Sequence, residues 1–283
     1  MANFQPLPVE PNMQAWRGHA LATYTAGQGA PVLLVHSINA AASAYEVRHP
    51  FTDLQHDYTT HALDLPGFGL SARPPRLYRA TDYIEVLMQM LSSIGKPTIL
   101  MASSLSSAFA IGAAARLPHL VRALVLVAPV GISQLSQPPT PIQSFSYDLL
   151  RGSFGDVVFG ILSSQTVVRY YLEQQTYGDP ARLTQEVQNN FHATTQFPGA
   201  KYAPICFVTG MLNYDVRREF ARLSMPILIL WGRKLKITPV RYAQEFLATN
   251  PQAQLVVIEE SGLPIEDSPA EFNTQVRSFL AGV

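Results

Sequence analysis

The sequence predicts an α/β protein with a mostly parallel eight-stranded sheet, helices on both faces of the sheet, and one inserted helical segment. Short apolar runs, typical of buried strands, alternate with segments of helical periodicity along much of the chain. This alternation favours right-handed strand–helix–strand units. It stops near Gly131 and resumes at Pro226, and no run between these residues has the pattern of a buried strand.

The predicted elements follow one another from the amino terminus. Residues 14–26 alternate weakly between apolar and polar and indicate an antiparallel pair of edge strands. The other predicted strands span residues 31–35, 58–63, 98–101, 121–127, 226–231 and 254–258. Helices are predicted over residues 81–94, 105–117, 240–248 and 269–280.

The break in this pattern divides the chain. Residues 1–131 and 224–283 are expected to form the core, and residues 132–223 a helical cap. The cap segment is rich in aromatic residues, most of which would form its own core. The others are expected to help enclose an apolar cavity over the sheet.

Composition excludes several classes of function. The 283 residues carry no net charge and 47% are hydrophobic, so nothing steers the chain toward nucleic acid or an anionic membrane. One cysteine, Cys206, precludes an internal disulfide. The first ten residues lack the pattern of a signal peptide, and no apolar run is long enough to span a membrane. A cytoplasmic protein is therefore expected. The histidines have no metal-ligand spacing, and no cofactor is predicted.

The turn between residues 98–101 and 105–117 contains the most informative motif, Ala102-Ser-Ser-Leu-Ser106. It resembles the nucleophile elbow Gly-x-Ser-x-Gly of the α/β-hydrolase superfamily, with Ala102 and Ser106 at the two glycine positions. The resemblance implies that Ser104 is the nucleophile, presented at the carboxyl end of the sheet. The plainer interpretation is that the neighbouring serines cap the helix.

Four further motifs extend the resemblance over nearly the whole chain. In order they are His36-Ser37, Asp64-Leu-Pro-Gly-Phe-Gly-Leu-Ser71, Trp231-Gly232 with Thr238-Pro239, and Gly262 with Pro269 and Phe272. All are similar to α/β-hydrolase motifs and occur in the family's order. Capped esterases and carbon–carbon bond hydrolases are the expected relatives.

The same resemblance shows where the catalytic triad is incomplete. The family's acid follows the seventh strand in Trp-Gly-x-x-Asp, and Leu235 stands at that position. The family's histidine follows the eighth strand, and Leu263 stands there under the simplest alignment. Alternatively the loop is one residue shorter and the histidine is deleted. No histidine occurs after His192. Because a serine hydroxyl needs a histidine and an orienting carboxylate, triad hydrolysis is expected to be weak or absent.

Other residues of the predicted pocket follow from the same motifs. The resemblance implies an oxyanion hole formed by the backbone N–H groups of Ile38 and Leu105. His36, Ser37 and Ser103 are expected beside it, with His36 holding the loop. Substitute bases remain open; the candidates are His192, His36, Glu259, Glu260, Glu266 and Asp267. Packing histidines and solvated surface acids are the more ordinary interpretation of these residues.

Three hypotheses of function follow. The first is a degenerate hydrolase that binds a small apolar molecule or ester. The second is an active serine esterase with an unrecognised base, and the third is a non-catalytic interaction protein. The first places an apolar cavity between the cap and six loop residues. These residues are Ser37, Ile38, Ser104, Leu105, Leu235 and Leu263.

Overall fold

The computed structural model describes residues 4–283 and contains one eight-stranded sheet in the order β1-β2-β4-β3-β5-β6-β7-β8. Strand β2 runs antiparallel to β1 and β4, and all other neighbouring strands are parallel. The mostly parallel eight-stranded sheet is thus confirmed. The strands are β1 (Asn12–Trp16), β2 (His19–Ala26), β3 (Ala30–Val35), β4 (Tyr58–Leu63), β5 (Thr98–Ser103), β6 (Val121–Val127), β7 (Ile227–Gly232) and β8 (Gln254–Ile258).

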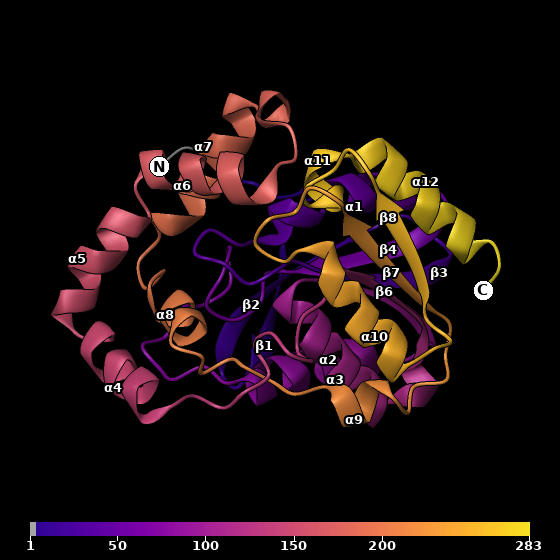
Figure 1. Ribbon diagram of the computed structural model, residues 1–283, viewed down its shortest axis with the longest axis horizontal. Coiled ribbons are helices and arrows are strands. Elements are labelled where there is room, and N and C mark those ends of the chain that lie inside the picture. The colour runs from indigo at the N-terminus through magenta and orange to yellow at the C-terminus, as the bar shows by residue number, and fades with distance from the viewer. Residues whose placement is uncertain (1–3) are drawn as a thin grey trace.

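Helices cover both faces of this sheet (Figure 1). One layer contains α2 (Ala80–Ile94), α3 (Leu105–Arg116) and α10 (Ala243–Thr249), and the other contains α1 (Arg48–Leu54) and α12 (Pro269–Leu280). Two apolar clusters separate the layers from the sheet: Tyr83, Phe109 and Phe246 belong to one, Phe51 and Phe272 to the other. Central strands are continuous apolar runs because both of their faces are buried.

Between β6 and β7 the structure describes helices and no strand. Residues 132–223 are called the helical insertion below. Figure 1 shows most of its helices in an arc beside the core. The α-helices of the insertion are α4 (Pro141–Leu150), α5 (Ser153–Leu162), α6 (Gln165–Tyr171), α7 (Gln185–Thr195), α8 (Tyr202–Val208) and α9 (Arg217–Phe220). A π-helix lies at Leu172–Thr176 and a 3₁₀ helix at Pro180–Arg182.

The helical insertion is joined to the core in part through its last helices. Ala203 and Cys206 of α8 and Phe220 of α9 belong to the main apolar cluster of the core. A small separate cluster instead joins residues of α6, the π-helix and α7, among them Leu172 and Phe191, to Ala41 and Tyr45 of the core. The helical insertion therefore contacts the core through two distinct apolar clusters.

The outer surface of the helical insertion is apolar in places. Phe145 of α4 and Phe154, Val157 and Ile161 of α5 are exposed. No helix of residues 4–283 is both long and apolar enough to cross a membrane.

Candidate active site

Ser104 lies at the sharp turn from β5 to α3. Its backbone has φ 52° and ψ −125°, and positive φ is rare for a residue other than glycine. The Ser104 N–H donates to the carbonyl of Val127 at the end of β6, at 2.8 Å. Ala102 and Ser106, at the glycine positions of the elbow motif, are fully buried. A strained residue held in this way is typical of a functional site.

Ser104 faces a cavity of 360 Å³. The lining contains five of the six residues expected there: Ser37, Ile38, Ser104, Leu235 and Leu263. Leu105 is fully buried and does not line the cavity. Its N–H opens helix α3, however, and therefore has no acceptor within the helix.

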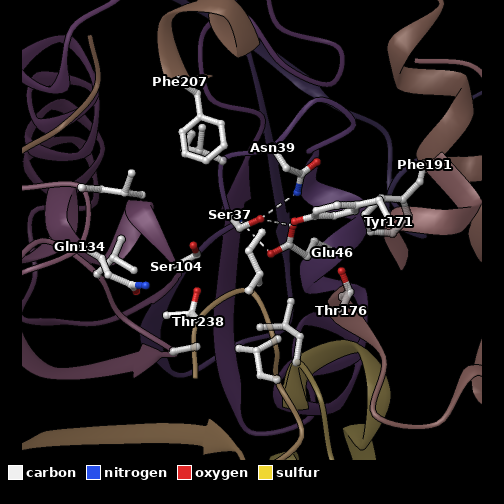
Figure 2. A pocket seen from close by; sticks show the side chains of 17 residues that line it. Ser37, Asn39, Glu46, Ser104, Gln134, Tyr171, Thr176, Phe191, Phe207 and Thr238 are labelled. Atoms are coloured by element: carbon white, nitrogen blue, oxygen red, sulfur yellow. Dashed lines mark hydrogen bonds between the residues drawn. The ribbon is translucent and has the colours of Figure 1, made fainter. Parts of the chain in front are cut away.

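The two leucines lie where the resemblance places a catalytic acid and a histidine. Leu235 follows β7, and its N–H donates to the carbonyl of Gly232 at 3.3 Å. The N–H of Leu263 donates to the carbonyl of Thr176 at 2.7 Å. Both side chains line the cavity, and no histidine does so among the described residues. Figure 2 shows no hydrogen bond reaching Ser104 from the residues drawn.

Neither candidate histidine is placed to activate Ser104. His36 is fully buried, with Nδ1 2.6 Å from the carbonyl of Ser37, while Nε2 accepts from the N–H of Leu65 at 3.0 Å. These partners require a neutral ring protonated on Nδ1, and burial lowers the pKa of His36 accordingly. His192 lies on α7, contacts the side chain of Gln196, and is absent from the cavity lining.

Two of the candidate acids are surface residues. Glu259 pairs with Arg233 at 2.8 Å, and Glu260 pairs with Lys234. All four side chains are exposed, and none lines the cavity. Exposed pairs of this kind contribute little to stability and have no route to Ser104.

The other two acids are buried but occupied elsewhere. Glu266 binds Arg48 through two contacts of 2.7 and 2.9 Å and accepts from the Tyr177 hydroxyl at 3.1 Å. Asp267 accepts from the N–H of Gly262 at 2.6 Å. Neither lines the cavity. Within residues 4–283 no cluster of histidine, cysteine and acidic side chains is placed to hold a metal ion.

Glu46 is the carboxyl group in the cavity wall that sequence reasoning missed. It lies in the 3₁₀ helix Ala44–Val47 and accepts from the N–H of Ser37 at 2.9 Å and from its hydroxyl at 2.7 Å. Asn39 donates to the same hydroxyl at 3.0 Å. Glu46 is 2% exposed, and burial raises its pKa to about 7 although Ser37 opposes the shift. One acid within the small and apolar run 40–47 was the signal available in the sequence.

Ser103 and His36 lie behind the cavity wall rather than in it. Both are fully buried and absent from the lining. The Ser103 hydroxyl has no hydrogen-bond partner among the described residues. Of the three pocket residues expected from the sequence, the structure therefore brings only Ser37 to the cavity surface.

The helical insertion supplies aromatic side chains to the cavity: Tyr171 from α6, Phe191 from α7 and Phe207 from α8 (Figure 2). Burial and the nearby Glu46 raise the pKa of Tyr171 to about 12, so its phenol is neutral. A second cavity of 240 Å³ adjoins the first and shares these three residues in its lining. The rest of its wall is almost entirely apolar, so the combined space has one polar end and one apolar end.

Asp64 holds the loop that carries Glu46 against the sheet. One carboxylate oxygen accepts from the N–H of Ala44 at 2.6 Å. The other accepts from the Tyr24 hydroxyl at 2.7 Å and the Leu70 N–H at 2.8 Å. A Cβ added at Gly69 would lie 1.9 Å from this carboxylate. The Asp64–Ser71 motif therefore has a structural role beside the cavity.

Comparison with known proteins agrees with this architecture. A pimeloyl-(acyl-carrier protein) methyl ester esterase of Vibrio parahaemolyticus is 25% identical over 260 residues, covering 89% of this chain and 95% of that protein. An uncharacterized protein of Mycobacterium tuberculosis is 26% identical over 273 residues, covering 93% and 79%.

Solved structures of hydrolases share the fold. A serine hydrolase involved in carbazole degradation superposes with a TM-score of 0.80 at 20% identity, over 96% of this chain and 99% of that one. A meta-cleavage product hydrolase from Pseudomonas fluorescens gives 0.75 at 20% identity, over 94% and 95%. The sequence model of the alpha/beta hydrolase family matches residues 32–275, and the chain belongs to that family.

Proposed function

We propose that this protein binds a small, largely apolar compound in the Ser104 cavity and hydrolyses esters there only slowly. The observation that carries the proposal is the pair Leu235 and Leu263. Both residues line the cavity. The sequence resemblance assigns them to the positions of the acid and the histidine in an active family member. In this proposal the helical insertion, residues 132–223, acts as a cap, and residues 1–131 and 224–283 form the core.

The chemistry left at the site is limited. A serine hydroxyl is a weak nucleophile until a base removes its proton, and none of the side chains drawn in Figure 2 makes a hydrogen bond to Ser104. The N–H groups of Leu105 and Ile38 are the expected oxyanion donors. Binding and an oxyanion hole without a triad still accelerate acyl transfer roughly 10³–10⁴-fold over water. Slow turnover is therefore expected rather than none.

Two observations support esters and related compounds with an apolar chain as the ligand class. The second cavity is walled mainly by apolar side chains, among them Val158, Phe159 and Leu162 of α5. A relative that aligns with 89% of the chain is named as a methyl ester esterase. Burial of an apolar chain in such a wall is worth about 0.8 kcal/mol per methylene group.

The direct test measures turnover of p-nitrophenyl esters by the wild type and by Ser104→Ala. We expect rates far below the enzyme median of about 10 per second, and nearly the same rate in both proteins. A fluorophosphonate probe should label Ser104 slowly. Rapid labelling, with ester turnover abolished in Ser104→Ala, would contradict the proposal.

Restoring the missing groups tests the assignment of the two leucines. The double variant Leu235→Asp with Leu263→His should hydrolyse esters faster than the wild type, and each single variant should change little, because triad members act as a unit. Ser104→Ala added to the double variant is the control. A gain that survives this control would show that the new histidine acts without Ser104.

A second candidate is an active serine hydrolase that uses Glu46 as its base. The observation in its favour is that Glu46 is the one carboxyl group in the lining of the cavity among the described residues. A general base is most effective when its pKa lies near the working pH, as that of Glu46 does. Ester turnover at ordinary enzymatic rates, lost in both Ser104→Ala and Glu46→Gln, would establish this candidate in place of the first.

A further inference from the structure

The ionisable residues that line the two adjoining cavities are acidic only, with no basic residue among those that the structure describes. Their combined lining, within residues 4–283, contains one carboxyl group, that of Glu46, and no lysine, arginine or histidine. A ligand that enters this space therefore meets one acidic group at the polar end and apolar walls elsewhere. Nothing in the lining would neutralise an anionic head group.

Within the described part of the chain, Glu46 forms no salt bridge with a cation. Arg48, the nearest cation along the chain, binds Glu266 at 2.7 Å and lies over the ring of Tyr45 at 4.0 Å. The N–H and hydroxyl of Ser37 donate to the Glu46 carboxyl group, and the Ser103 hydroxyl lies close enough to lower its pKa. Buried carboxylates in proteins are ordinarily paired, because an isolated charge in a low-dielectric interior is costly. Because Glu46 lines the cavity, its carboxyl group is the charged group that a ligand there would meet.

One aromatic side chain lies beside this carboxyl group. Figure 2 shows the hydrogen-bonded group of Asn39, Ser37 and Glu46 with the ring of Tyr171 next to it, while Phe191 and Phe207 line the cavity on opposite sides of this group. Ring faces attract cations, most strongly where water is excluded. A carboxyl group without a counter-ion, next to an aromatic ring, is the chemistry that recognises an ammonium group.

We propose that the ligand of this cavity carries an ammonium group, held between Glu46 and the ring of Tyr171, and an apolar remainder that extends into the second cavity. This inference rests on the proposed function, because it names the class of compound bound at the same site. It also disfavours carboxylates as ligands above pH 7, where Glu46 is ionised, since a fatty acid would place its negative head group beside Glu46 with no cation to offset the repulsion.

Glu46 is the residue of the cavity lining that titrates near neutral pH, because the ionisable groups around it keep a fixed charge in this range. Tyr171 faces it from α6 and is neutral, since its pKa lies at about 12. Glu266 of α11 (Pro264–Asp267) raises the pKa of Glu46 further through its negative charge, and Glu266 is itself paired with Arg48. His36, at the end of β3, is held neutral by its two partners. Ammonium binding below pH 7 therefore requires Glu46 to release a proton.

The test compares hexylammonium, 1-hexanol and hexanoate by isothermal titration calorimetry at pH 8. The three share a chain and differ in the head group. We expect hexylammonium to bind at least about tenfold more tightly than hexanol, and hexanoate to bind most weakly. The preference for hexylammonium should fall about tenfold for each pH unit below 7, with release of one proton.

Three variants locate the effect. Glu46→Gln keeps the shape of the side chain and should remove the preference for hexylammonium while hexanol still binds. Tyr171→Leu should reduce the preference on the order of fivefold, whereas Tyr171→Phe, which keeps the ring, should retain it. Far-ultraviolet circular dichroism and melting temperature check that each variant is folded.

The outcomes separate this inference from the proposed function. If hexanol binds and hexylammonium binds no more tightly, the ammonium inference is wrong and the binding function stands. If Glu46→Gln retains the preference, the inference is also wrong. If none of the three compounds binds, the proposed binding function fails, and the inference fails with it.

Discussion

Replacing Glu46 by glutamine should stabilise the protein increasingly as the pH rises. Burial raises the pKa of Glu46 from 4.5 to about 7, so the folded state holds a proton that the unfolded state releases. The contribution of this group to stability is fully present below pH 4.5 and is lost as the pH rises through 7. At about 1.4 kcal/mol per pH unit between the two pKa values, the loss between pH 5 and pH 8 is about 2.5 kcal/mol.

Urea unfolding of the wild type and Glu46→Gln at pH 5, 6, 7 and 8 measures this difference. The free energy of unfolding of the variant minus that of the wild type should rise by about 2.5 kcal/mol over the range. Glu259→Gln is the matched control, because Glu259 is exposed and Arg233 lowers its pKa. Its difference from the wild type should stay flat above pH 5. A flat difference for Glu46→Gln would show that Glu46 is ionised throughout the range, and would refute the reasoning.

Two further predictions concern stability. Arg48→Met should lower the free energy of unfolding by about 3 to 5 kcal/mol in urea titrations at pH 7, because it leaves the fully buried side chain of Glu266 without its cation. A loss below about 1 kcal/mol, as for an exposed ion pair, would contradict this. Gly69→Ala should destabilise the protein by at least about 2 kcal/mol more than Gly18→Ala. Both glycines have positive φ, but the added Cβ meets the Asp64 carboxylate only at Gly69. Equal melting temperatures for the two variants would count against the close contact.

Much of the fold was predictable from local sequence. A strand in the middle of a parallel sheet is covered on both faces, so it appears as a short continuous apolar run. The runs at 98–101, 121–127 and 226–231 correspond to β5, β6 and β7 for this reason. The short helices α1 and α11 were not predicted, because helices of this length depend on tertiary packing rather than on their own propensity.

The candidate site was likewise predictable in part from local sequence. The elbow at Ser104 and the leucines at 235 and 263 follow from motifs that are contiguous in the chain. The sequence alone therefore predicts a nucleophile position without its usual partners. The backbone at Ser104, with φ 52°, agrees with the sharp turn that the motif requires.

Only the tertiary structure places Glu46 in the cavity beside Ser37 and Tyr171. Tyr171 lies more than 120 residues from the other two, and an acid within the apolar run 40–47 indicates burial at most, not the cavity in which Glu46 lies. Its burial, its lack of a counter-ion and the resulting rise in its pKa depend on which side chains the folded chain brings around it. Periodicity and motifs are properties of neighbouring residues and can be read from the chain, whereas the electrostatics of a cavity arise from contacts between distant segments and exist only after folding.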